Sequence, residues 1–112
     1  MDTEQLRSRL REFARDRDWE QYHTPKNLSM ALAGEAAELL EIFQWLTPEE
    51  SLAVKSSPKE REQVEAELAD IVNYVVRLAD VLDIDLEKAV LHKLEKNAAK
   101  YPAAGPDTPR SR

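Results

Sequence analysis

Two pairs of acidic residues have the spacing that brings side chains together on one side of a helix. Glu35 and Glu38 form the first pair, and Glu67 and Asp70 form the second. Residues three apart lie on neighbouring turns of an α-helix, so each pair can offer two carboxylates to one ligand. Two such helices packed together would surround a common point with four carboxylates, which is the chemistry of a divalent-cation site.

The first acid of each pair lies within the apolar arc of its segment. On a helical wheel at about 100° per residue, Glu35 falls between Leu28 and Ile42. Glu67 falls beside Leu78 on the second segment, and the second acid of each pair lies toward the edge of the arc. Ionised carboxylates are rarely buried unless they are paired or bound to a metal. The sequence therefore predicts a cation between two helices.

The available ligand atoms favour a hard cation. The chain has no cysteine and two histidines, so an all-oxygen site predicts Mg²⁺, with Mn²⁺ as the second choice. A di-iron bundle would need Glu-x-x-His on two helices, but the second acids here are Glu38 and Asp70. The remaining interpretation, two solvated acidic faces, requires both pairs to fall on apolar arcs by coincidence.

Three aromatic residues are candidates for contact with a ligand of this site. Trp45 lies beside Glu38 on the wheel, and its indole could stack on a planar ligand. Tyr74 neighbours Glu67, so that its hydroxyl could hydrogen-bond to a ligand, although a buried tyrosine with a protein partner fits nearly as well. For Trp19, ligand contact and anchoring of its loop against the core stay open as alternatives.

A basic strip follows the last predicted helix. It consists of Lys93, Lys96, Asn97 and Lys100. These side chains could neutralise the charge of an anionic ligand, and we favour Lys93 and Lys100 for that role over Lys96. Lysines at a helix C-terminus also complement the helix dipole without any ligand. His92 lies off the strip and is expected to be structural or exposed.

Five helical segments, four long and one short, would position these residues. Capping residues followed by proline start three of them, at Thr24, Thr47 and Ser57, and a glutamate three residues after Thr47 and Ser57 predicts a capping box at each. The expected ranges are about 3–17, 25–46, 47–54, 58–82 and 85–100. On the fourth segment, polar residues lie opposite the apolar stripe and are expected in solvent: Glu62, Asn73, Arg77 and Asp80.

Composition bounds the class of protein. The 112 residues predict a single all-α domain over 1–102 and a flexible proline-rich tail over 103–112. A formal charge of −6 argues against binding a nucleic-acid polymer. There is no apolar run near the roughly 20 residues of a membrane span, and the acidic start is not a signal peptide, so we expect no membrane contact and a cytoplasmic location. The helices carry more apolar surface than one small core covers, which predicts a homodimer or homotetramer.

The ordered motifs resemble those of a known family. Glu-x-x-Glu followed by Glu-x-x-Asp is similar to the signature of the MazG-like all-α NTP pyrophosphatase superfamily, and the other matches resemble its dCTP pyrophosphatase branch. The matching segments cover nearly the whole chain outside the tail: 17–23, 27–28, 34–38, 43–45, 67–70 and 100–102.

The resemblance implies a fold, a reaction and roles for particular residues. The fold would be a four-helix MazG-like bundle with one short extra helix, assembling into a dimer or tetramer with sites near subunit boundaries. The reaction would be Mg²⁺-dependent conversion of a (deoxy)nucleoside triphosphate, with dCTP or a modified dCTP expected, to the monophosphate and pyrophosphate, as nucleotide-pool house-cleaning. The four acids would be the catalytic metal ligands. The substrate-binding residues would be Trp19, His23, Trp45, Tyr74, Lys93, Asn97 and Lys100.

One departure and one alternative accompany this hypothesis. Some dCTP-preferring members have a first-helix histidine near the nucleotide where this chain has Leu10, which leaves the base preference open. The alternative is a non-enzymatic helical assembly module whose acidic faces bind a basic partner. That alternative predicts a fold indifferent to Mg²⁺, because a ligand stabilises only the folded state that binds it.

Overall fold

The computed structural model describes residues 1–103, and these form helices and connecting turns without a β-strand. The helices are α1 (Thr3–Asp16), α2 (Pro25–Phe43), α3 (Pro48–Ala53), α4 (Pro58–Val81) and α5 (Leu86–Lys100), with 3₁₀ turns η1 (Glu20–Tyr22) and η2 (Val54–Ser56). The predicted all-α class with four long helices and one short one is confirmed. The flexible tail predicted for 103–112 lies, beyond residue 103, outside the described residues.

Most helix starts follow from side-chain caps. The Thr24 hydroxyl accepts from the backbone N–H of Asn27 at 3.2 Å, and Asp85 accepts from Lys88 at 3.1 Å. Thr47 and Glu50 form the full capping box at the start of α3. Each cap supplies an acceptor for a backbone N–H that has no partner inside its helix.

The capping box predicted at Ser57 is wrong. No backbone N–H of α4 donates to the Ser57 hydroxyl, which instead donates to the Glu60 carboxylate. That hydrogen bond is the main cause that lowers the pKa of Glu60. Proline at the first position still starts α4 where the sequence predicts it, because its fixed φ suits the first turn.

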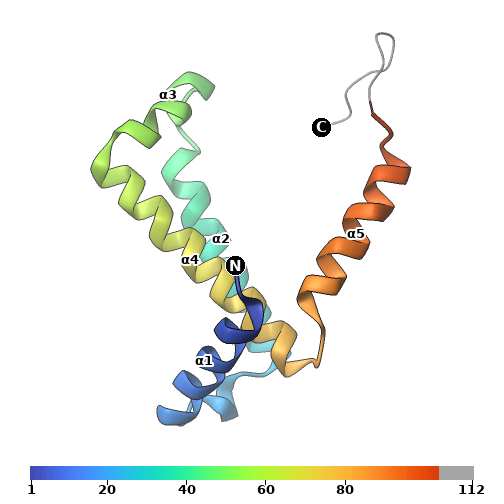
Figure 1. Ribbon diagram of the computed structural model, residues 1–112. Coiled ribbons are helices and arrows are strands. Elements are labelled where there is room, and N and C mark those ends of the chain that lie inside the picture. The colour runs from blue at the N-terminus through green and yellow to red at the C-terminus, as the bar shows by residue number, and fades with distance from the viewer. Residues whose placement is uncertain (104–112) are drawn as a thin grey trace.

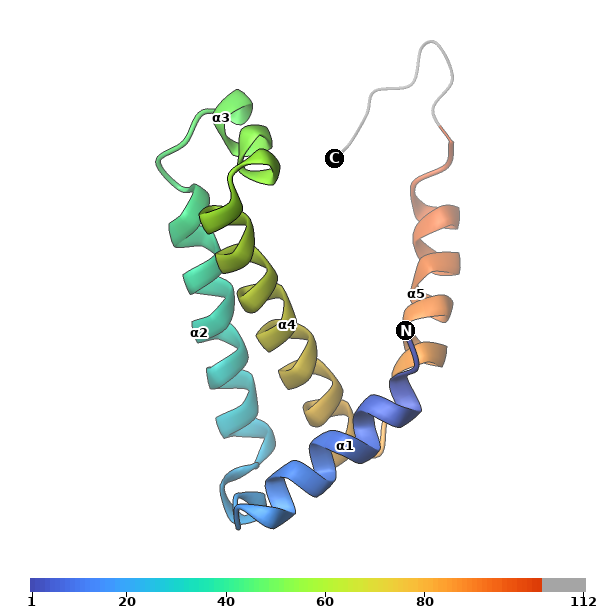
Figure 2. The same cartoon turned by 60° about the vertical axis from the view of Figure 1, so that its left-hand side comes forward.

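Two antiparallel helices form the body of the molecule. Figures 1 and 2 show α2 and α4 side by side along their length, with α3 near one end and α1 crossing the other. In both views α5 leaves the end of α4 and runs away from this pair as a separate arm. Three of its apolar residues, Val90, Leu91 and Leu94, are each more than half exposed. No helix within residues 1–103 combines the length and hydropathy needed to cross a membrane.

The polar residues near the end of α4 correct the sequence-based prediction. Arg77 and Asp80, expected in solvent, are only 8% and 6% exposed. The prediction from the helical wheel assumed that α4 packs against one partner on its apolar face. In the structure, α4 packs against both α2 and α1. Because α1 crosses α4 near this end, it encloses side chains that a single-partner wheel assigns to solvent.

A network of ion pairs makes this burial possible. Asp80 accepts hydrogen bonds from Arg11 Nε at 3.0 Å and from Arg77 Nη1 at 3.1 Å, and Arg7 lies 3.5 Å away. The hydrogen bond from Arg11 is the main cause that lowers the pKa of Asp80, so the carboxylate stays ionised. Buried charges are tolerated when they are paired and hydrogen-bonded in this way. The network joins α1 to α4.

Candidate active site

Three of the four predicted acids converge between α2 and α4. Glu35 and Glu38 come from α2 and Glu67 from α4, and one carboxylate oxygen of each lies within 4.8 Å of the others. The antiparallel pairing of the two helices places the middle of α2 opposite the middle of α4. We call these three residues the acidic cluster.

The acidic cluster is electrostatically incomplete. Glu35 Oε2 and Glu67 Oε2 are buried and have no hydrogen-bond partner among the described residues. The pKa of Glu67 is raised to about 7, chiefly by the hydrogen bond its protonated form makes with Glu35, then by burial and by the charge and hydrogen bonding of Glu38. Unpartnered carboxylate oxygens that repel one another suit a hard cation, so the residues present fit Mg²⁺ or Mn²⁺.

This repulsion predicts a pH dependence for the metal-free protein. A carboxyl group whose folded pKa is raised from 4.5 to about 7 stabilises the fold fully below pH 4.5, and that stabilisation is lost as pH rises through 7. In EDTA, the unfolding free energy should therefore fall between pH 5 and 8 relative to that of Glu67→Gln, which cannot ionise. Urea denaturation of both proteins across this range measures the difference. If the unfolding free energies of the two proteins changed with pH in the same way, the predicted repulsion would be contradicted.

The fourth predicted acid lies beside the acidic cluster, not within it. Asp70 is exposed and is absent from the group of carboxylates that converge. It lines a neighbouring cavity of about 290 Å³ with Trp19, His23 and Tyr74. One helical turn separates Asp70 from Glu67, so the wall of this cavity begins one turn along α4 from the acidic cluster. Its role as a fourth metal ligand stays a prediction.

The neighbouring cavity brings together three predicted substrate-binding residues from different parts of the chain. We call it the aromatic pocket; its lining residues are Leu10, Phe13, Trp19, His23, Asp70, Asn73, Tyr74 and Arg77. Trp19 packs edge-on against Phe13, with ring centroids 5.7 Å apart and planes at 68°. An aromatic wall next to acidic side chains can receive a planar base on one side and a metal-bridged phosphate group on the other.

The other predicted substrate-binding residues lie away from this pocket within one chain. Trp45 is 87% exposed just past the end of α2. His23 precedes the start of that helix, whose 19 residues span about 28 Å. Lys93, Asn97 and Lys100 lie on α5, the arm that runs away from α2 and α4.

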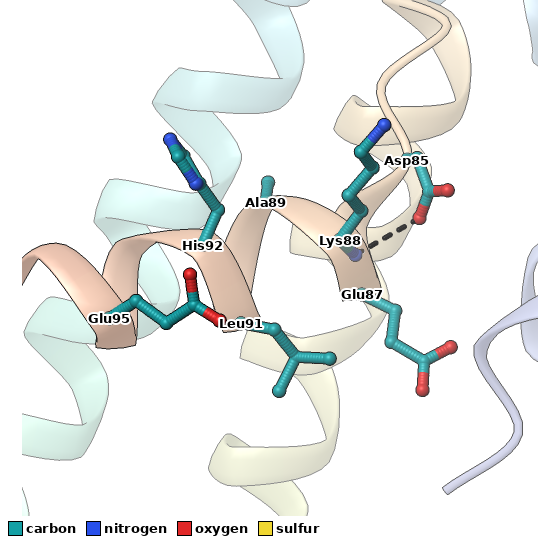
Figure 3. A pocket seen from close by; sticks show the side chains of 7 residues that line it. All are labelled: Asp85, Glu87, Lys88, Ala89, Leu91, His92 and Glu95. Carbon is teal, nitrogen blue, oxygen red and sulfur yellow. Dashed lines mark hydrogen bonds between the residues drawn. The ribbon is translucent and has the colours of Figure 1, made fainter.

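A shallow hollow lies along α5 itself. Figure 3 shows the side chains that line this hollow, among them those of Leu91, His92 and Glu95. All its lining residues come from α5 and its cap Asp85, and His92 is exposed, as expected. A single helix face cannot enclose a ligand, so we do not treat this hollow as part of the site.

Sequence reasoning missed three residues of the aromatic pocket. Phe13 was not singled out as a site residue, and Asn73 and Arg77 were assigned to the solvent face of α4. A signal was present, because Asn73, Arg77 and Asp80 follow each other at i, i+4 and i+7 and so form one stripe. A polar stripe on a helix with two packing partners indicates a second, buried polar face.

Comparison with known proteins identifies the family of this chain. The model of the MazG-like family matches residues 31–108. The chain is 48% identical to bovine dCTP pyrophosphatase 1 over 99 residues, which are 88% of this chain and 59% of that protein. It is 47% identical to human dCTP pyrophosphatase 1 over 89% of this chain and 59% of that protein. The chain thus spans about three fifths of the length of the curated relatives it matches.

A solved structure matches over almost the full length of both chains. It is a crystal structure of a pyrophosphatase from Archaeoglobus fulgidus, with 43% sequence identity and a TM-score of 0.83, covering 92% of this chain and 94% of that one. The helical fold of this chain is therefore shared with that pyrophosphatase. This chain belongs to the MazG-like family.

Proposed function

We propose that this protein is a Mg²⁺-dependent nucleoside triphosphate pyrophosphohydrolase. It would convert a deoxynucleoside triphosphate, dCTP or a modified dCTP first among them, to the monophosphate and pyrophosphate. The observation that carries the proposal is the acidic cluster directly beside the aromatic pocket, on a chain similar to dCTP pyrophosphatases over most of its length. Removal of unwanted nucleotides in the cytoplasm would be the corresponding biological role.

The chain's own residues would divide the work between charge and positioning. Glu35, Glu38 and Glu67 would hold the cation, with Asp70 as the nearest further carboxylate. When bound, Mg²⁺ would neutralise charge on the triphosphate oxygens and favour departure of pyrophosphate. One of the carboxylates would also accept a proton from the attacking water. Trp19 would stack on the base, and the Tyr74 hydroxyl would meet the sugar or a phosphate.

We also propose that the working protein is a homodimer or homotetramer. Val90, Leu91 and Leu94 are 57%, 56% and 63% exposed on an arm that extends from the body of the chain. A second copy that covered this face would bury apolar surface, and it could bring Trp45, Lys93, Asn97 and Lys100 to the pocket of its partner. Light scattering at micromolar concentration should give a dimer or tetramer mass. A monomer mass with full activity would contradict the proposal.

Product analysis tests the proposed reaction. With Mg²⁺, dCTP should yield dCMP and pyrophosphate in equal amounts, without orthophosphate. dCDP should be a poor substrate, because it lacks the pyrophosphate leaving group. A panel of canonical and modified deoxynucleoside triphosphates would rank the substrates. Stoichiometric orthophosphate with dCDP as product would place the protein in another class of hydrolase, and no turnover of any triphosphate would favour the assembly-module alternative.

Leu10 leads to a prediction about base preference. Its side chain lines the aromatic pocket but has no group that can hydrogen-bond a base edge. Since strong discrimination needs such hydrogen bonds, we expect a preference for dCTP over dTTP that is present but incomplete. Leu10→His should sharpen it by about tenfold, the value of roughly one well-placed hydrogen bond. The measurement is the ratio of kcat/KM for the two substrates in both proteins. A very sharp preference that Leu10→His leaves unchanged would show that other residues read the base.

A further inference from the structure

A continuous chain of polar contacts connects the buried ion-pair network to the aromatic pocket. Arg77 Nη1 donates to Asp80 Oδ2 at 3.1 Å, and Arg77 Nε donates to Nδ1 of His23 at 2.9 Å. Arg11 donates to the same Asp80 carboxylate at 3.0 Å. Because Arg77 and Asp80 are buried, these contacts are part of the packed interior. These contacts join α1 to α4 at Asp80, and they join α4 to the segment before α2 at His23.

The contact between Arg77 and His23 restricts how the imidazole can be protonated. A guanidinium group has only N–H donors, so Nδ1 of His23 must be an unprotonated acceptor. The proton of the neutral ring is then on Nε2. A doubly protonated ring would instead place an N–H against an N–H. The pKa of His23 is lowered, first by burial and then by the positive charge of Arg77, which agrees with a neutral ring.

We infer that Arg77, held in place by Asp80, is a positioning residue that fixes His23 as a hydrogen-bond donor through Nε2 in the aromatic pocket. His23 lines this pocket, and its Nδ1 is already engaged. Any hydrogen bond from the ring to a ligand therefore comes from Nε2–H. The complementary ligand group is an acceptor: a carbonyl oxygen or an unprotonated ring nitrogen of a base. The nucleotide identity of that ligand rests on the proposed function, whereas the protonation of the ring does not.

A fixed donor has a consequence for recognition. A histidine free to change tautomer could meet either a donor or an acceptor, and so would discriminate poorly. Cytosine has an unprotonated N3, whereas N3 of thymine and uracil carries a hydrogen. Where Nε2–H meets this position, the site favours cytosine over the other two bases, because a donor facing a donor is left unpaired. The inference therefore offers a source of base discrimination that does not depend on Leu10.

Nitrogen NMR of the ligand-free wild-type protein tests the assigned tautomer directly. In protein labelled with ¹⁵N-histidine, the long-range ¹H–¹⁵N spectrum distinguishes a protonated ring nitrogen from an unprotonated one. Only two histidines contribute, and His92, exposed on α5, provides the solvent-averaged reference. His23 should show a single neutral form protonated at Nε2 at pH 7. A form protonated at Nδ1, a charged ring or a mixture of tautomers would overturn the inference without any variant.

Three substitutions then separate positioning from structural support. Arg77→Gln supplies an amide that both donates and accepts, so His23 should populate both tautomers. Arg77→Lys supplies only donors and should keep the proton on Nε2. Arg11→Gln is the matched control, since it weakens the same ion-pair network without touching His23. Equal spectra for Arg77→Gln and Arg11→Gln would overturn the positioning role.

Kinetics provides the readout on the ligand. Arg77→Gln should raise KM for dCTP about three- to tenfold with kcat nearly unchanged, as expected for one misoriented hydrogen bond. Arg77→Lys should restore most of the loss, and Arg11→Gln should stay within about twofold of wild type. A fall in kcat alone, or equal losses in all three variants, would contradict the inference. Absence of wild-type turnover would contradict the proposed function and leave the NMR result to decide the tautomer.

Discussion

Glu38→Gln and Glu67→Gln should each lose at least about a hundredfold in kcat/KM for dCTP at saturating Mg²⁺, with the helical circular dichroism unchanged. The amide keeps the shape of the side chain but removes the charge that binds the cation. A hundredfold loss corresponds to about 3 kcal/mol of transition-state stabilisation, a reasonable share for one ligand of a metal that neutralises a triphosphate. Steady-state kinetics over a range of Mg²⁺ concentrations would measure it.

A control on the same helix makes this result specific. Glu62→Gln removes an exposed carboxylate from α4, one that lies outside the acidic cluster, and should retain activity within about twofold. In metal-free buffer, Glu67→Gln should also be at least as stable as the wild type at pH 8, because it relieves repulsion among the three acids. Near-full turnover by both Glu38→Gln and Glu67→Gln would show that catalysis does not require the acidic cluster.

The largest effect on stability is expected at Asp80. Asp80→Asn leaves Arg7, Arg11 and Arg77 without their shared carboxylate, and Arg77 is buried. Removing one partner of a buried ion pair typically costs about 3–5 kcal/mol, a large fraction of the stability of a small domain. Urea denaturation at pH 7 should show this loss as a lower midpoint.

The pH dependence identifies the cause of that loss. The pKa of Asp80 is lowered in the folded state. The ionised side chain therefore stabilises the fold at pH values above the ordinary pKa of an aspartate, and this stabilisation is lost as the pH falls through the folded pKa. The difference in unfolding free energy between wild type and Asp80→Asn should therefore become smaller in acid. Asp83→Asn is the matched control: Asp83 is exposed and has a φ of 55°, a conformation that asparagine adopts readily. A loss below about 1 kcal/mol for Asp80→Asn would show that the ion pairs do not hold α1 against α4.

Local patterns were sufficient to predict the helices. Thr24, Thr47 and Asp85 each cap a backbone N–H at the predicted start, and the structure ends each long helix no more than three residues from the expected position. The placement of Glu35 and Glu67 in apolar arcs also predicted their convergence, since two apolar faces that pack together bring whatever they carry into contact.

Features that depend on more than two packed helices were not predictable in the same way. The burial of Arg77 depends on α1 crossing α4, and the wheel of α4 contains no information about that crossing. The positions of Trp45 and Lys93 relative to the pocket depend on where the end of α2 and α5 lie in the fold, which the wheel of a single helix does not specify. Ser57 does not cap α4 through its side chain, and its hydroxyl donates to Glu60 instead.

Direct measurement of cation binding tests the central claim, that the acidic cluster holds a divalent metal. Titration of the wild-type protein with Mn²⁺, followed by electron paramagnetic resonance, reports the free ion and hence the fraction bound. Wild type and Glu62→Gln should bind Mn²⁺ equally, Mg²⁺ should compete, and Glu67→Gln should bind at least about tenfold more weakly. Equal Mn²⁺ binding by wild type and Glu67→Gln, or no binding by either, would contradict the account.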